Sequence, residues 1–249
     1  MEGLSYYRIT RRDFQMNRQD RKNDVDKKDQ LIVLNRMLKD DNKSSGNVKL
    51  KEELINLETL FIQRQDRLWR ALKERYHYHT SVKHSQDFLL KRVSTKMPLV
   101  IMYADLVGST QMSMTLPVEK LVTIIRAFSH EMSSVVEIHN GHVLKYVGDA
   151  VIAFFTLGFN RYLTYDKAVR CAKWMINVVN YGINPILNKY NYPKLSIKNG
   201  IDVGEIAVVQ YAYDKSSQID ILGYTMNVAA KITSLTICCI LRYGRNFIS

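Results

Sequence analysis

The sequence predicts an α+β fold, a ferredoxin-like βαββαβ antiparallel sheet with helices on one face, preceded by a helical N-terminal segment. The first observation is an apolar run at 99–104, which is typical of a buried strand. It is followed by apolar residues every three or four positions over 117–139, which indicates an amphipathic helix. Pro117 suits the first turn of this helix, and Asn140-Gly141 suits its end.

The second observation is a pair of short apolar runs at about 142–147 and 150–155, joined at Gly148-Asp149 in the manner of a hairpin. The third is a second helical pattern over roughly 164–190. A strand should follow at about 195–203, with Gly204 as a turn before 205–211. The order of these elements is the order of a split βαβ sheet.

Pro98 suggests a domain boundary, because it follows a polar stretch and precedes the first buried strand. We expect residues 1–97 to be a charged, partly helical regulatory or dimerisation segment and 98–249 to be the main domain. A helix is expected over 48–80, where leucine and phenylalanine follow a 4-3-4-7 spacing. This apolar stripe could pair with its twin in a dimer or dock onto the downstream domain.

Composition restricts the class of protein. The sequence contains no run of 18 apolar residues and no apolar signal-peptide core, so we expect a cytoplasmic protein without a membrane span. Its three cysteines are too few and too badly spaced for a disulfide framework or a zinc site. Residues 1–97 carry a net charge of +8 out of the total of +12, but their charges are mixed in sign. Specific nucleic-acid binding is therefore not expected.

Two aspartates carry most of the chemical information. Asp105 follows the first predicted strand, within YADLVGST, and Asp149 lies in the predicted hairpin turn, within KYVGDAVIAFF. In a split βαβ sheet the first strand and the central hairpin are neighbours, so both carboxylates should reach one edge. Two carboxylates at that edge would repel each other unless cations lay between them. This pattern predicts a site for a pair of divalent metal ions, which suits chemistry on a nucleoside triphosphate.

These motifs resemble the catalytic domain of the class III nucleotidyl cyclases, over about 98–236. The resemblance implies that Asp105 and Asp149 bind two Mg²⁺ ions, with Mn²⁺ as a substitute. It also implies that the backbone of the next five residues cradles phosphates. They are Leu106, Val107, Gly108, Ser109 and Thr110.

The resemblance extends to the base and the ribose. Lys145 matches the lysine with which adenylate-forming members read the purine edge, and Asp220 matches its acidic partner. Adenine presents an acceptor nitrogen beside an amino donor, which complements a cation and a carboxylate, whereas guanine presents the reverse pattern. The pair therefore favours ATP as substrate and an adenylate cyclase as the enzyme. Asn227 matches the asparagine that orients the ribose, and Lys231 stands where the family usually has an arginine that reaches the α-phosphate.

Family resemblance also implies a head-to-tail homodimer, because the sites of this family lie between two catalytic domains. After about residue 236 the sequence departs from the family pattern, so the domain is truncated or atypical there. This departure and Lys231 leave an alternative hypothesis. The chain could be a degenerate cyclase-like domain that binds nucleotide or acts as a regulator. A guanylate cyclase and a basic nucleic-acid-binding protein are less favoured alternatives.

Overall fold

The structure is a computed structural model that describes residues 47–74, 82–211, 218–236 and 241–243. By contacts, the chain divides into a unit of residues 1–55 and a compact unit of residues 56–249. The first unit is described only at the start of helix α2 (Asn47–Glu74). The first 46 residues lie outside the described residues. All that follows concerns the second unit.

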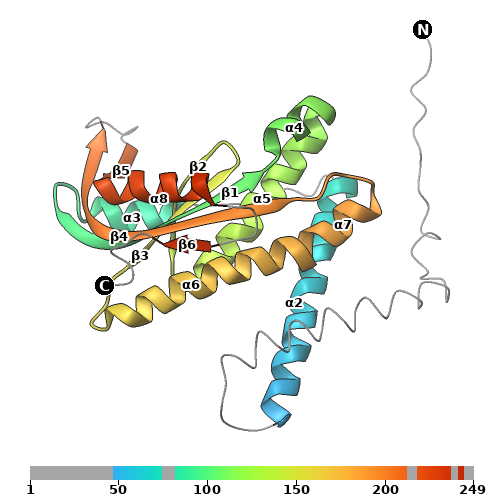
Figure 1. The fold of residues 1–249 in the computed structure, drawn as a ribbon, viewed down its shortest axis with the longest axis horizontal. Helices are drawn as coiled ribbons and strands as arrows, with labels where there is room; N and C mark the ends of the chain where they lie inside the picture. Colours follow the sequence, from blue (N-terminus) through green and yellow to red (C-terminus); the bar gives the residue numbers. More distant parts are fainter. Residues whose placement is uncertain (1–46, 75–81, 212–217, 237–240, 244–249) are drawn as a thin grey trace. The chain divides into compact units, whose positions relative to one another are not determined.

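The compact unit contains a mixed sheet whose main path has the strand order β2-β3-β1-β4-β5 (Figure 1). All neighbours along this path are antiparallel, and β6 pairs with β4 in parallel. The α+β ferredoxin-like prediction is confirmed. The strands are β1 (Lys96–Val107), β2 (His142–Val147), β3 (Ala150–Thr156), β4 (Ser196–Tyr211), β5 (Gln218–Leu222) and β6 (Leu241–Tyr243).

The two predicted crossover helices cover one face of the sheet. They are α5 (Val118–Ile138) and α6 (Arg161–Asn177), and α6 continues through a π-helical turn, η3 (Val178–Ile183), into α7 (Asn184–Lys189). Asn140 adopts a left-handed φ of 58° just after α5, which agrees with the predicted end of that helix. Three helices were not predicted, α3 (Lys83–Leu90), α4 (Ser109–Thr115) and α8 (Tyr224–Leu235).

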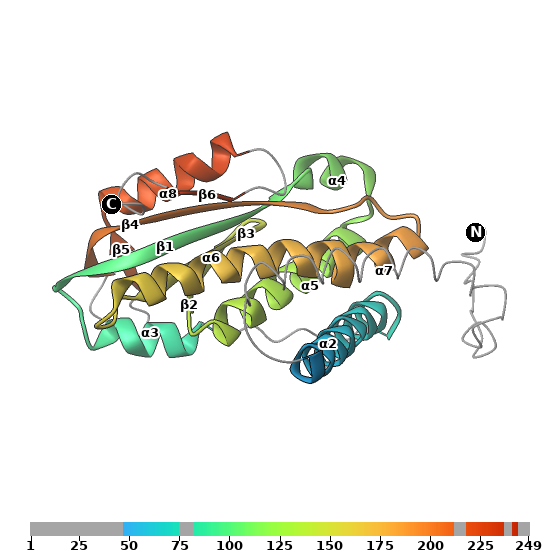
Figure 2. The same ribbon diagram turned by 60° about the horizontal axis from the view of Figure 1, so that its bottom comes forward.

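The opposite face of the sheet, which was expected to carry no helix, is covered by α3 and by α8. Figure 2 shows α8 and α6 on opposite sides of β1 and β4. A core cluster on the α8 side joins Leu89 of α3 and Met226 of α8 to apolar residues of all five strands of the main path. Burial on both faces explains why 99–104 reads as a continuous apolar run.

The turn predicted at Gly204 is wrong, because β4 runs without interruption from Ser196 to Tyr211. A Cβ at Gly204 would overlap the hydroxyl of Thr225 on α8, and a Cβ at Gly200 would overlap the hydroxyl of Thr233. These glycines therefore serve close packing of a helix on a strand. The division of the chain at 97/98 stays a prediction, and β1 begins at Lys96.

Helix α2 docks onto the same chain through its described second half. Leu68 is fully buried, and Phe61 stacks on Trp174 of α6 with ring centroids 6.1 Å apart. A buried ion cluster joins α2 to α5: Arg64 and Arg67 both contact the Glu131 carboxylate, with Arg67 Nε 2.9 Å from Oε1. Arg64 and Glu131 are almost completely buried. Of the two possibilities for the α2 stripe, docking within the chain is observed for this half.

We expect Glu131→Ala to lower the free energy of unfolding by about 3–5 kcal/mol, because it leaves the buried Arg64 cation without its carboxylate. The matched control is Arg70→Ala, which removes an exposed i,i+4 pair with Asp66 and should cost less than about 0.5 kcal/mol. Urea unfolding followed by circular dichroism measures both. A cost below about 1 kcal/mol for Glu131→Ala would show that the cluster does not hold α2 on the domain.

Candidate functional site

Asp105 and Asp149 lie at the same end of the sheet. Asp105 is near the end of β1, and Asp149 lies in the turn between β2 and β3. The register of β1 with β3 ends at Ala104 opposite Val151, so the next residues along each strand approach each other. Gly148 adopts a left-handed φ of 61° that makes the tight turn possible. The structure thus brings together the two carboxylates that the sequence singled out.

The electrostatics of this end confirm the proximity. Burial raises the pKa of the Asp105 carboxyl, and the negative charge of Asp149 raises it further. Lys198 and the backbone N–H of Leu106 lower the same pKa. Two like charges with one nearby lysine leave an acidic site, which suits oxygen-preferring divalent cations.

Lys198 is a site residue that the sequence reasoning missed. It lies on β4 directly opposite Asp105 in the β1–β4 register, so both side chains are on the same face of the sheet. No local motif marks Lys198, since it belongs to the strand by an alternating pattern only. Lys198 lies 93 residues after Asp105 in the sequence, so only the pairing of β1 with β4 reveals that they are neighbours.

The segment proposed to cradle phosphates follows Asp105 without a gap. Leu106 is buried and Val107 is the last residue of β1, whereas Gly108 has a left-handed φ of 85° and precedes α4. The chain therefore turns sharply beside Asp105 and leads into α4 at Ser109 and Thr110. Its contact with phosphate stays a prediction.

Lys145 and Asp220 form an ion pair, although they lie on β2 and β5, the two edge strands of the main path. The two side chains are 32% and 12% exposed, so the pair is partly shielded from water but remains reachable. Tyr103 of β1 lies near this pair. Burial and the nearby charge of Asp220 both raise the pKa of its phenol. A cation, a carboxylate and a phenol thus converge above the middle of the sheet.

The orientation of Lys145 is supported from the other face of β2. The register between β2 and β3 shifts between Val143 and Lys145, which marks an irregularity immediately before the lysine. The Tyr146 hydroxyl lies 2.7 Å from Ser133 Oγ of α5, and Ser133 in turn donates to the carbonyl of Ser129. Since Ser133 donates to Ser129, its oxygen accepts the bond from Tyr146. These two hydrogen bonds anchor β2 to α5 one residue beyond Lys145.

Asn227 and Lys231 lie one turn apart on the exposed side of α8. The opposite side of the helix, including Ala229 and Thr233, is buried against the sheet. Among the described residues, neither Asn227 nor Lys231 forms a hydrogen bond or ion pair with Asp105 or Asp149. Both side chains are therefore presented outward.

Two further observations concern metals and membranes. Within the described ranges, His, Cys, Asp and Glu form no cluster of three or more that could hold a metal by themselves. The acidic site therefore offers two carboxylates, and further ligands would have to be backbone, water or substrate oxygens. No helix in the described part of the chain has the length and apolarity to cross a membrane.

Comparison with known proteins identifies the family. Residues 92–238 match the model of the adenylate and guanylate cyclase catalytic domain. This match covers more than half of the chain, so the chain belongs to that family and contains a nucleotide cyclase catalytic domain of class III.

Related proteins carry different base specificities in their names. The chain is 25% identical to a cytidylate cyclase of Escherichia coli over 62% of its own length and 34% of that protein. It is 28% identical to a uridylate cyclase of Burkholderia cepacia, over 63% of this chain and 68% of the relative. An adenylate cyclase of Anabaena cylindrica is 24% identical over 60% of this chain and 29% of the relative. The chain thus spans about a third of the Escherichia coli and Anabaena proteins.

Solved structures agree on the fold. The guanylyl cyclase Cya2 is similar with a TM-score of 0.58 and 22% identity, covering 63% of this chain and 79% of that one. The adenylyl cyclase CyaB from P. aeruginosa has a TM-score of 0.56 and 22% identity, covering 61% of this chain and 79% of that one.

One buried carboxylate on the α8 side of the sheet forms no ion pair with any described residue. Asp202 of β4 is 1% exposed, and neither carboxylate oxygen makes a side-chain hydrogen bond to another described residue. Burial raises the pKa of Asp202, and the backbone N–H of Val203 offsets part of that rise. The folded chain thus favours the neutral form of this group.

We expect Asp202→Asn to stabilise the protein at pH 7 by on the order of 1 kcal/mol. Because the folded-state pKa is raised, the stability that the bound proton contributes is present below about pH 4 and is lost as the pH rises through the folded-state value. The variant should lack this loss. Urea unfolding of both proteins at pH 4 and pH 7 tests this prediction. The control is Asp87→Asn, which changes an exposed carboxylate of α3. Equal stabilities at pH 7, with parallel pH profiles, would mean that Asp202 is partnered.

Proposed function

We propose that the chain is a magnesium-dependent adenylate cyclase, which forms cyclic AMP and pyrophosphate from ATP. The observation that carries this proposal is the meeting of Asp105 and Asp149 at one end of the sheet in a nucleotide cyclase domain. We assign residues 98–249 to the catalytic domain and 1–97 to a regulatory or dimerising segment.

The acidic end fits a pair of divalent cations. The Asp105 carboxyl is disfavoured as an anion both by burial and by Asp149, so positive charge between the two carboxylates would remove an existing repulsion. Mg²⁺ is commonly bound through one or two carboxylates together with substrate phosphates, which matches the two carboxylates found here. Bound there, the ions would lower the pKa of the ribose 3′ hydroxyl and neutralise charge on the leaving pyrophosphate. Lys198 supplies a further positive charge on the same face.

Lys145 and Asp220 support a base that carries an amino group beside an acceptor ring nitrogen. The Lys145 ammonium donates and the Asp220 carboxylate accepts, which complements the N1 acceptor and the amino donor of adenine. Guanine and uracil present a carbonyl beside a ring N–H and would leave buried groups unpaired. Cytosine shares the adenine pattern, so CTP is the sharpest competitor of ATP, and one relative is named a cytidylate cyclase.

Exposed placement of Asn227 and Lys231 supports a shared site. Facing away from their own sheet, they are available to a second copy in a head-to-tail homodimer. In that arrangement Asn227 orients the ribose and Lys231 stabilises charge on the α-phosphate. The 3′ hydroxyl loses its proton to solvent as its oxygen bonds to the α-phosphorus, the bond from that phosphorus to the bridging oxygen breaks, and pyrophosphate leaves. The backbone from Leu106 to Thr110 holds phosphate oxygens in place.

A second candidate function is nucleotide binding without turnover. Lys231 favours it, because a lysine lacks the planar bidentate fork with which an arginine contacts phosphate. This candidate predicts nucleotide binding by a folded dimer that forms no cyclic product.

We expect Asp149→Ala to reduce cyclic AMP formation from ATP by at least about 10³-fold with either Mg²⁺ or Mn²⁺, because only one metal-binding carboxylate remains. The control is Asp87→Ala, which changes an exposed residue of α3 and should keep full activity. Mass spectrometry of the product and a thermal unfolding curve of each variant measure the outcome. Activity retained in a folded Asp149→Ala variant would exclude the proposed metal site. No product from the wild-type chain, with ATP still bound, would favour the second candidate.

Base selectivity tests the Lys145 and Asp220 assignment separately. We expect kcat/KM in the order ATP, CTP, then GTP and UTP, and Asp220→Asn should lower the value for ATP by about 10- to 100-fold while lowering the ATP to GTP ratio. Glu205→Gln, on an exposed position of β4, is the matched control. An unchanged ATP to GTP ratio in Asp220→Asn would remove this pair from base recognition.

A further inference from the structure

A second exposed feature lies far from the two carboxylates, at the turn between β3 and α6. It comprises Phe159, Tyr162 and Leu163, which we call the apolar tip, together with Arg161. Phe159 is fully exposed, and Tyr162 and Leu163 are 74% and 59% exposed. The register places this turn at the opposite end of the sheet from Asp105, because β3 ends at Thr156 opposite Leu99, near the start of β1.

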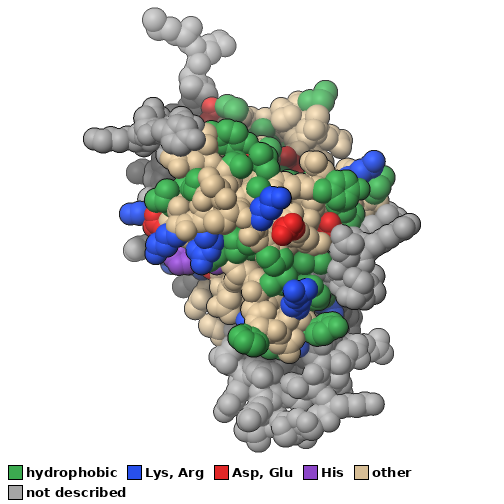
Figure 3. Space-filling view, turned by 90° about the vertical axis from the view of Figure 1, so that its left-hand side faces the viewer, with side chains coloured by type: hydrophobic (Ala, Val, Ile, Leu, Met, Phe, Trp, Pro, Cys, Tyr) green, Lys and Arg blue, Asp and Glu red, His purple; other side chains and the backbone are tan. Residues whose placement is uncertain are grey.

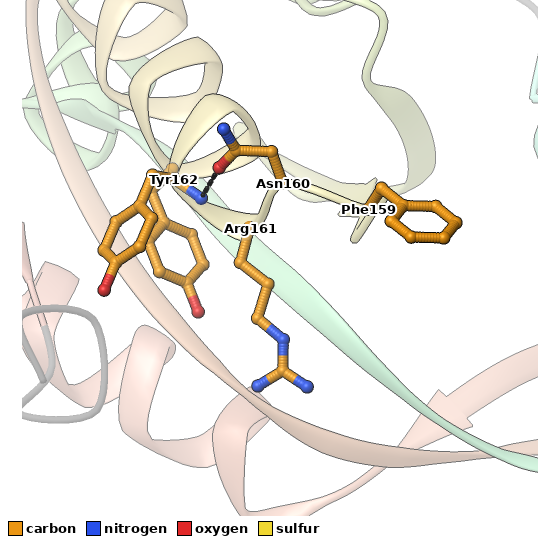
Figure 4. Close-up of a pocket in the computed structure, with 5 residues that line it drawn as sticks. Phe159, Asn160, Arg161 and Tyr162 are labelled. Carbon is orange, nitrogen blue, oxygen red and sulfur yellow. Dashed lines mark hydrogen bonds between the residues drawn. The ribbon is translucent and has the colours of Figure 1, made fainter.

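Local structure holds the tip in place. Asn160 caps α6 by accepting a hydrogen bond from the Tyr162 backbone N–H at 3.1 Å, and the Tyr162 ring contacts Tyr165 edge-on at 6.1 Å between centroids (Figure 4). The side chains line an open pocket of about 400 Å³, with Phe159 on the side opposite Tyr162 (Figure 4). This pocket is separate from the catalytic carboxylates. This pocket is open to solvent, which does not suit an enclosed small molecule.

The exposed side of α6 beyond the tip is basic. From 161 to 173 its exposed charged residues are four cations and one anion, namely Arg161, Lys167, Arg170, Lys173 and Asp166. Asp166 is already paired with Arg170 at 2.7 Å. Figure 3 shows the molecular face at the left of Figure 1, on which hydrophobic and basic side chains lie close together with a few acidic ones among them.

We propose that the apolar tip and the basic side of α6 dock onto an anionic phospholipid surface. Phe and Leu side chains on a protruding turn enter the boundary between headgroups and acyl chains, and Tyr is favoured at that depth. Lysines and arginines beside them attract anionic headgroups, each contributing within about one Debye length. A protein partner would need a matching concavity for a fully exposed phenylalanine, whereas a fluid bilayer accepts a convex tip. This inference is independent of the proposed catalytic activity.

Vesicle flotation with the full chain tests the proposal. Vesicles of phosphatidylcholine alone are compared with vesicles containing 30% phosphatidylglycerol, in about 0.15 M salt. We expect binding to the anionic vesicles only. Phe159→Ser with Leu163→Ser should lower the partition coefficient by about tenfold or more. Lys167→Glu with Lys173→Glu should lower it and weaken its salt dependence.

Ile138→Ser is the matched control, because Ile138 is a similarly exposed aliphatic residue at the end of α5. It should bind as the wild type does. Thermal unfolding confirms that each variant is folded. No flotation with anionic vesicles, or equal flotation of the tip variant, would overturn the proposal. A tip variant that instead changes the oligomeric mass by light scattering would assign the tip to self-association and equally overturn it.

Discussion

The fold and the candidate site both depend on the pairing of β1 between β3 and β4. Every residue of β1 has a partner on β4, from Lys96 opposite Ala207 to Val107 opposite Ser196. This register brings Asp105 beside Lys198 and, through β3, towards Asp149. A slip of one residue would turn Asp105 to the face covered by α5 and α6, so burial of the apolar run 99–104 also fixes the position of the carboxylate.

The sheet lies between two groups of charged side chains. On one side, the buried cluster of Arg64, Arg67 and Glu131 holds α2 against α5. On the other side, Lys145 pairs with Asp220. The Tyr146 hydrogen bond to Ser133 links β2 to α5 between these two groups, two residues from Glu131 along the helix. The contacts of α2 with α5 and of α5 with β2 thus continue up to the strand that carries Lys145.

Local patterns were enough for much of the fold, because α5 and the β2–β3 hairpin are defined by periodicity and by turn residues. Gly204 was wrongly predicted to be a turn. A glycine required by close packing against Thr225 looks the same in the sequence as a glycine required by a turn. Lys198 was missed because only long-range strand pairing reveals it. Asp105, Asp149, Lys145 and Asp220 were found through motif order and family resemblance, and their meeting in space depended on the sheet topology.

The most direct test of the account is electron paramagnetic resonance of Mn²⁺ bound to the full chain with a non-hydrolysable ATP analogue. We predict two spin-coupled Mn²⁺ ions per site, with the coupling lost in Asp105→Asn because only the Asp149 carboxylate would remain to hold the ions. Mn²⁺ bound equally well by Asp105→Asn, with an unchanged spectrum, would contradict the claim that the end of β1 and the β2–β3 turn form one metal site.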